Sequence, residues 1–86
     1  MTYQYEVNIY RSEDTCNTTK TNNVSLALAT LAEARHKCLP CEIIDGFTGE
    51  VYAHFNIDQT EDYICPLWNY VLYGYGMLHY NQKNRV

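Results

Sequence analysis

Apolar and polar side chains alternate with a period of two over residues 3–10. Tyr3, Tyr5, Val7 and Ile9 share one side of an extended chain, and polar residues occupy most of the other side. This period is typical of a strand with one face in a core. The first predicted element is therefore a half-buried β-strand.

The following segment, residues 12–23, is almost wholly polar. It contains four Thr and three Asn, residue types whose side chains hydrogen-bond to neighbouring backbone groups and favour turns. We therefore expect an exposed loop here rather than a packed element.

Residues 24–37 predict an amphipathic helix. Strong helix formers dominate the segment, and its apolar positions recur at intervals of three and four residues: Val24, Ala27, Leu28, Leu31, Ala34 and Cys38. Asn23 is a suitable N-cap, and Pro40 prevents the helix from continuing. The apolar stripe is expected to pack on the sheet.

Two further strands, residues 41–45 and 50–55, flank a short turn at residues 45–49. Asp45, Gly46 and Gly49 supply the backbone conformations that a tight turn requires. The pattern predicts a β-hairpin.

The last third of the chain is less conventional. Residues 58–61 predict a short helical turn that lasts until Pro66, because an acid follows an Asx cap by three positions. Residues 67–80 are expected to form a second helix with Pro66 at its first position. Two glycines in this segment weaken the predicted helix, so an extended conformation remains an alternative. Residues 81–86 are expected to be a flexible tail.

These elements predict one α+β domain spanning residues 1–86, in the order β-α-β-β-α. A right-handed crossover through the helix would make the first two strands parallel, and the hairpin would make the second and third antiparallel. The predicted sheet has three strands, with the third between the other two, and helices over one face.

The charge is distributed unevenly along the chain. The net charge is −4, but no Lys or Arg occurs between Lys37 and Lys83, where six acids lie: Glu42, Asp45, Glu50, Asp58, Glu61 and Asp62. Phosphate binding depends on Lys and Arg, so this balance argues against direct contact with DNA or RNA and favours a protein partner with a basic surface. The alternative is a solvated acidic face that only keeps the domain soluble.

No apolar run approaches the roughly 20 residues of a membrane span, and the first residues lack the basic and apolar regions of a signal peptide. We therefore expect a cytoplasmic protein without membrane contact, whose four cysteines are reduced.

Cys38 and Cys41 form a CxxC motif, which commonly supplies half of a zinc site. Further ligands would come from scattered residues: Cys16, His36, His54 and Cys65. A thiol redox protein is a second interpretation, although a thioredoxin-like pair normally begins a helix, and Cys38 follows one. The simplest alternative is that both thiols are buried as small apolar side chains.

The sequence contains no nucleophile elbow, P-loop, dinucleotide-binding fingerprint or calcium-binding loop. A chain of this length also supports only one small core. We therefore expect a non-enzymatic protein with no catalytic residue and no cofactor.

Aromatic residues are concentrated near the end of the chain, where six of the twelve lie between Tyr63 and Tyr80. Tyr and Trp are enriched at interfaces because they combine a large apolar area with a polar group. We therefore expect a protein partner, or a homodimer through residues 66–80, to cover this segment. The expected contact residues are acidic and aromatic: Glu50, Asp58, Glu61, Asp62, Trp68 and Tyr73.

The layout of residues 3–56 resembles small orphan proteins of bacteriophages. The likeness lies in a short strand with Tyr and Val, a helix rich in Ala and Leu, and the segment 41–52 with its Ile-x-Asp-x-x-Thr-Gly-Glu-Val turn. Small acidic phage proteins often bind and block a host enzyme or a defence complex, as anti-CRISPR proteins do. The resemblance implies an inhibitor that acts by protein binding in the host cytoplasm, and it carries over no individual residue.

Overall fold

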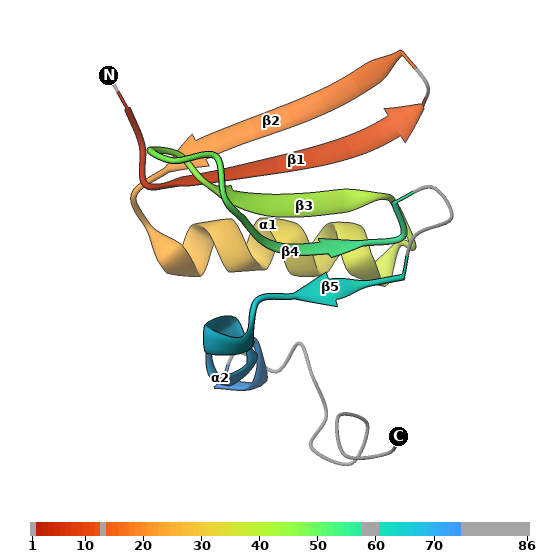
Figure 1. Ribbon diagram of the computed structural model, residues 1–86. Helices are drawn as coiled ribbons and strands as arrows, with labels where there is room; N and C mark the ends of the chain where they lie inside the picture. Colours follow the sequence, from red (N-terminus) through yellow and green to blue (C-terminus); the bar gives the residue numbers. More distant parts are fainter. Residues whose placement is uncertain (1, 13, 58–60, 75–86) are drawn as a thin grey trace.

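The computed structural model describes residues 2–12, 14–57 and 61–74 (Figure 1). Its elements follow the chain as β1 (Tyr5–Ser12), β2 (Thr15–Thr21), α1 (Val24–His36), β3 (Cys41–Asp45), β4 (Val51–Phe55), β5 (Tyr63–Ile64), η1 (Pro66–Trp68) and α2 (Asn69–Gly74). The five strands form one antiparallel sheet in the order β2-β1-β3-β4-β5. The fold is therefore α+β, as predicted.

The prediction of a loop over residues 12–23 is wrong for most of that segment. Thr15–Thr21 is strand β2, which pairs with β1 along its length. The segment is exposed, as its polar composition indicates, because β2 is an edge strand whose two faces carry little of the core. Thr is β-branched and fits an extended backbone, so a polar strand rich in Thr is stable once it has a neighbour.

The additional strand also changes the topology. β2 returns the chain to the end of the sheet where β1 begins, and α1 then carries it back to the other end (Figure 1). β3 therefore runs antiparallel to β1, and the prediction of a parallel pair is wrong. The predicted strand order is wrong as well, because β3 lies between β1 and β4. The sheet also has five strands and not the predicted three, since β2 and β5 extend its two edges.

The helix α1 confirms the pattern that predicted it. Asn23 Oδ1 accepts hydrogen bonds from the backbone N–H groups of Ser25 and Leu26, at 2.9 and 3.2 Å, and so caps the first turn. Four residues of its predicted stripe are buried: Ala27, Leu28, Leu31 and Ala34. They pack on the buried sheet face formed by Val7, Ile9, Cys41, Ile43, Ala53 and Phe55.

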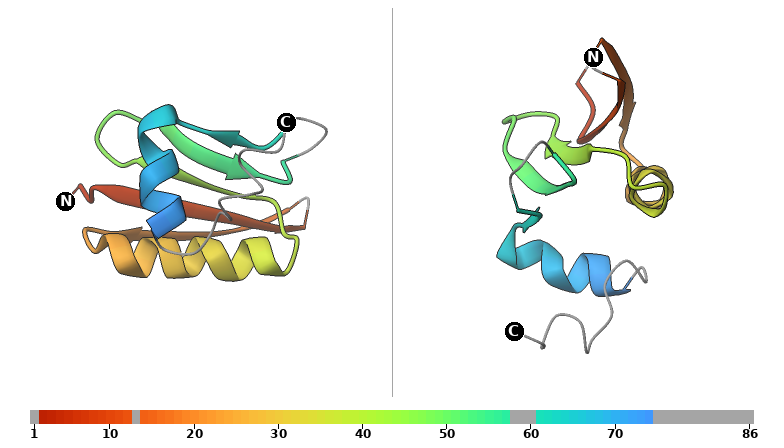
Figure 2. Two further views of the ribbon diagram at one scale, coloured as in Figure 1. Left: turned by 90° about the horizontal axis from the view of Figure 1, so that it is seen from below. Right: turned by 90° about the vertical axis from the view of Figure 1, so that its right-hand side faces the viewer.

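The second helix lies on the same side of the sheet as α1 (Figure 2). Leu72 of α2 is fully buried in the core, and Trp68 and Val71 pack against it. The preferred prediction of a helix is confirmed over Asn69–Gly74. Residues 75–80 and the predicted tail at 81–86 lie outside the described residues, as do residues 58–60 of the predicted helical turn. The prediction that this turn lasts until Pro66 is wrong, because Tyr63–Ile64 is strand β5.

The helices are short. α1 has 13 residues, and in the described ranges no helix combines the length and the apolar character needed to cross a bilayer.

The turn between β3 and β4 is pinned to the beginning of the chain. Asp45 Oδ1 accepts from the N–H groups of Phe47 and Thr48, at 2.7 and 3.2 Å. Gly46 N–H donates to the Gln4 carbonyl oxygen at 2.9 Å. A Cβ at Gly46 would overlap the backbone carbonyl of Tyr3, so this position requires glycine for its lack of a side chain.

We expect Gly46→Ala to lower the free energy of unfolding by about 1–3 kcal/mol, because backbone has to move to admit the methyl group. Urea denaturation followed by circular dichroism measures the change. Gly74→Ala is the matched control, since nothing lies within 4 Å of its Cβ position and Ala is the better helix former. Equal stability of both variants with the wild type would contradict the pinned turn.

Candidate functional site

One face of the sheet carries polar side chains and, among the described residues, no helix lies over it (Figure 2). A row of directly paired residues crosses this open face through all five strands: Thr18, Asn8, Glu42, His54 and Tyr63. Side chains on one face of neighbouring strands lie within contact distance of each other. The row therefore places two hydrogen-bonding groups, a carboxylate, an imidazole and a phenol side by side.

The centre of the open face is a hydrogen-bonded network. Glu42 Oε2 accepts from Asn8 Nδ2 at 2.9 Å and from the Tyr10 hydroxyl at 2.8 Å. Asn8 Nδ2 also lies 3.1 Å from Glu6 Oε2, and Thr18 Oγ1 donates to Asn8 Oδ1 at 2.7 Å. Asn8 is only 7% exposed, and its amide is satisfied by these partners. The network supports the sheet and leaves Glu42 less available to a partner.

Tyr10 is held in its neutral form by this network. Burial of its phenol raises its pKa to about 12, and the hydrogen bond to Glu42 and the charge of that carboxylate act in the same direction. A neutral phenol at ordinary pH is the donor that the carboxylate requires.

His54 has a different environment. Its ring stacks on Tyr63 with centroids 5.6 Å apart, and its Nδ1 is buried with no hydrogen-bond partner in the described part of the chain. Its partner in β3 is Glu42. The open face thus contains an imidazole beside a carboxylate, but the carboxylate is already bonded to Asn8 and Tyr10.

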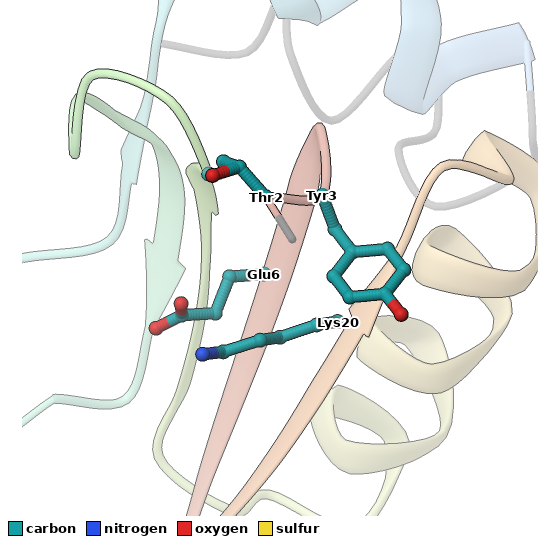
Figure 3. A pocket seen from close by; sticks show the side chains of 5 residues that line it. Thr2, Tyr3, Glu6 and Lys20 are labelled. Carbon is teal, nitrogen blue, oxygen red and sulfur yellow. The ribbon is translucent and has the colours of Figure 1, made fainter.

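A small hollow lies at one end of the open face, lined by Thr2, Tyr3, Glu6, Lys20 and Gly46 (Figure 3). Glu6 and Lys20 are direct partners in β1 and β2. The volume of the hollow is about 140 Å³, whereas sites for small-molecule ligands usually have roughly 300–1,000 Å³. It is too small for an organic substrate of ordinary size.

The predicted acidic contact residues do not form one patch. Glu50 is exposed just before β4, and Glu61 and Asp62 are exposed just before β5. Since β4 and β5 are antiparallel, these groups lie at opposite ends of β4, roughly 15–20 Å apart at about 3.4 Å per residue. Asp58 lies outside the described residues.

Several acids of the segment between Lys37 and Lys83, which contains no Lys or Arg, have hydrogen-bond partners within the fold. Asp62 Oδ1 accepts from the N–H of Asn56 at 2.9 Å. The pKa of Asp45 is lowered by the hydrogen bond from the Phe47 backbone and by that from the Tyr52 hydroxyl. Together with Glu42 they act within the fold. Among the described acids of this segment, Glu50 and Glu61 are exposed and are not used in these hydrogen bonds.

Trp68 is an anchor of the fold. Its ring stacks on Tyr52, with centroids 4.3 Å apart and an interplanar angle of 12°, and meets the edge of Tyr5 at 6.0 Å. Tyr52 reaches this position because it is the extra residue in a β-bulge, where Ile43 pairs with Ala53 and Ile44 with Val51. The aromatic stack therefore ties η1 and α2 to the sheet.

The other side of η1 and α2 exposes large apolar side chains at intervals of three residues. Leu67 is 81% exposed, Tyr70 80% and Tyr73 44%. We call these three residues the apolar surface. Sequence reasoning named Tyr73 but missed Leu67 and Tyr70 as contacts. Leu67 and Tyr70 each directly precede a residue that packs against the core, Trp68 and Val71. This spacing of three residues could have indicated that Leu67 and Tyr70 share the outer side of the helix.

The two cysteines of the CxxC motif have different environments. Cys38 is exposed and adopts a left-handed backbone conformation, with φ of 59°. Cys41 is buried in the core, where burial raises the pKa of its thiol to about 11. Zinc binds the thiolate, so the environment of Cys41 does not favour a metal. Among the described residues no group of three or more His, Cys, Asp and Glu is placed to hold one.

Comparisons of the chain with protein-family models, curated proteins and solved structures found no match. The support for any function therefore comes from the side chains that the fold exposes.

Burial of the Tyr10 phenol, together with its hydrogen bond to Glu42, makes the stability of the fold decrease at high pH. A phenol whose folded-state pKa is about 12 stabilises the fold below its unfolded pKa of about 10, and that contribution is lost as the pH rises toward 12. We expect Tyr10→Phe to lose less stability than the wild type as the pH rises from about 10 to about 12, measured by urea denaturation. Identical pH profiles of the two proteins would contradict a strong bond at this position.

Proposed function

We propose that this protein is a small, non-enzymatic protein-binding module whose contact site is the apolar surface of Leu67, Tyr70 and Tyr73. The observation that carries the proposal is the exposure of three large apolar side chains on one short helical segment. Isolated exposed hydrophobic residues are common, but a group of them rimmed by polar residues is typical of an interaction site.

The segment suits this role because it is anchored on one side and open on the other. Trp68 and Leu72 hold it to the sheet, so its conformation is set before a partner binds. Tyr side chains provide large contact areas with little loss of conformational entropy. A preorganised aromatic surface reduces the free-energy cost of association.

Charge supplies the second part of the proposal. Glu50 directly precedes β4. Because β5 runs antiparallel to β4, the chain leaves β5 and enters η1 near this same end of β4. No Lys or Arg occurs between Lys37 and Lys83. The partner is therefore expected to have a basic rim. In line with the phage-protein resemblance, we propose that binding blocks a host or defence protein by covering part of its surface.

The double variant Leu67→Ser/Tyr70→Ser tests the apolar surface. Proteins retained from a bacterial lysate by the immobilised wild type are identified, and the affinity for the retained protein is then measured by calorimetry. We expect the variant to bind at least about tenfold more weakly, because central aromatic and apolar contacts are each worth more than 1 kcal/mol. The matched control is Phe47→Ser, which removes a side chain that is 67% exposed on the β3–β4 turn and should bind normally. Equal affinity of the double variant and the wild type would contradict the proposal that the apolar surface is the contact site.

The charged rim has its own test with the same captured protein. Glu50→Gln removes the exposed charge beside η1. Glu61→Gln, at the opposite end of β4, is the matched control and should bind normally. For Glu50→Gln we expect slower association and a weaker dependence of the association rate on salt, with little change in the dissociation rate. An unchanged salt dependence would show that the partner does not respond to this acid.

A further inference from the structure

The two edges of the sheet differ in how they are protected. β5 has two residues, and Pro66 follows soon after it. β2 has seven residues, is terminal in the sheet order and is exposed over most of its length. Short edge strands and prolines prevent pairing with other chains. Only the β5 edge has both of these features.

The hydrogen bonds of β1 show which groups of β2 face outward. Tyr10 N–H donates to the Pro40 carbonyl oxygen at 2.9 Å, so the even-numbered residues of β1 bond toward β3. The odd-numbered residues of β1 then bond toward β2, because the direction alternates along an antiparallel strand. Their partners are Thr21, Thr19 and Asn17. The N–H and C=O groups of Cys16, Thr18 and Lys20 consequently point away from the sheet.

The outward edge of β2 has little to prevent pairing. Its seven residues include one charge, Lys20, and no proline. The register shift of the β1–β2 pair lies between Tyr10 and Ser12, at the tip of the hairpin and away from the middle of β2. Four of the seven residues are Thr, which favours extended backbone.

We propose that β2 pairs antiparallel with β2 of a second copy of this chain, with the two-fold axis at Thr18. In this register Thr18 faces the partner's Thr18, and Cys16 faces the partner's Lys20. In this register all three outward residues of each strand are paired, so six backbone hydrogen bonds cross the interface. A register shifted by two residues in either direction has only four backbone hydrogen bonds.

Charge also selects a second copy in this register. Lys20, the charged side chain of the strand, faces the partner's Cys16, so no two lysines oppose each other. A symmetric interface of this kind closes on itself and ends growth at two subunits, and the two sheets become one of ten strands. The row that crosses the open face then continues from Thr18 into the row of the second subunit.

Light scattering on the full chain tests the pairing with Thr18→Pro. This change removes an outward N–H and the hydroxyl that donates to Asn8, but none of the backbone hydrogen bonds to β1. The fold should therefore persist by circular dichroism while the dimer becomes a monomer. Thr18→Val is the matched control, because it keeps the backbone donor and the β-branched shape, and it should remain a dimer. A monomeric wild type, or a Thr18→Pro variant that folds and stays dimeric, would overturn the proposal.

A cross-link keeps the proposal testable even if Thr18→Pro does not fold. In a Cys16→Ser background, Thr18→Cys should form an intersubunit disulfide readily under mild oxidation, since directly bonded residues have Cα atoms about 5.5 Å apart. Asn17→Cys is the control: this position faces the partner's Thr19 rather than itself, so it should cross-link far less. Equal cross-linking of both variants contradicts the register. A dimer that dissociates on Leu67→Ser/Tyr70→Ser would instead place the interface on residues 66–80.

Discussion

The apolar stripe of α1 packs against one face of β1 and β3, and the rest of the molecule is arranged around that contact. A chain of 86 residues can form only one such core, so a single face of the sheet can be covered. The other face has to satisfy its polar groups among themselves. Asn8, Tyr10 and Glu42 do so through short hydrogen bonds, which explains why a buried amide is stable on a face that no described helix covers.

Periodicity predicted the elements that make this core. The strand at residues 3–10, the helix with its Asn23 cap and the β3–β4 hairpin each followed from side-chain spacing. β2 did not, because its residues bury almost nothing and a strand without a buried face has no period of hydrophobicity to detect. The direction of β3 was then wrong as a direct consequence, since a missing strand reverses the path of the chain.

The candidate site was less predictable than the fold. Local sequence identified acids and aromatic residues as a class, but their roles depend on pairing between distant segments. Trp68 anchors the second helix because β4 places Tyr52 against its ring. Glu50 and Glu61 lie far apart because β4 and β5 run in opposite directions. The two proposed surfaces lie at opposite edges of the sheet, about 19 Å apart at 4.8 Å per strand. A dimer through β2 would therefore carry one apolar surface at each outer end, and a partner with two copies of the target would be bound with increased avidity.

The bulge in β4 determines where the apolar surface sits. One extra residue in that strand turns the Tyr52 ring toward the helices, and Trp68 stacks on it. Deleting Tyr52, which is that extra residue, would remove the ring on which Trp68 stacks and would loosen the segment that carries Leu67, Tyr70 and Tyr73. These three residues are exposed, and none of them belongs to the buried core. The anchor and the contact residues can thus change independently in evolution, so new binding specificities can arise on this surface without rebuilding the sheet.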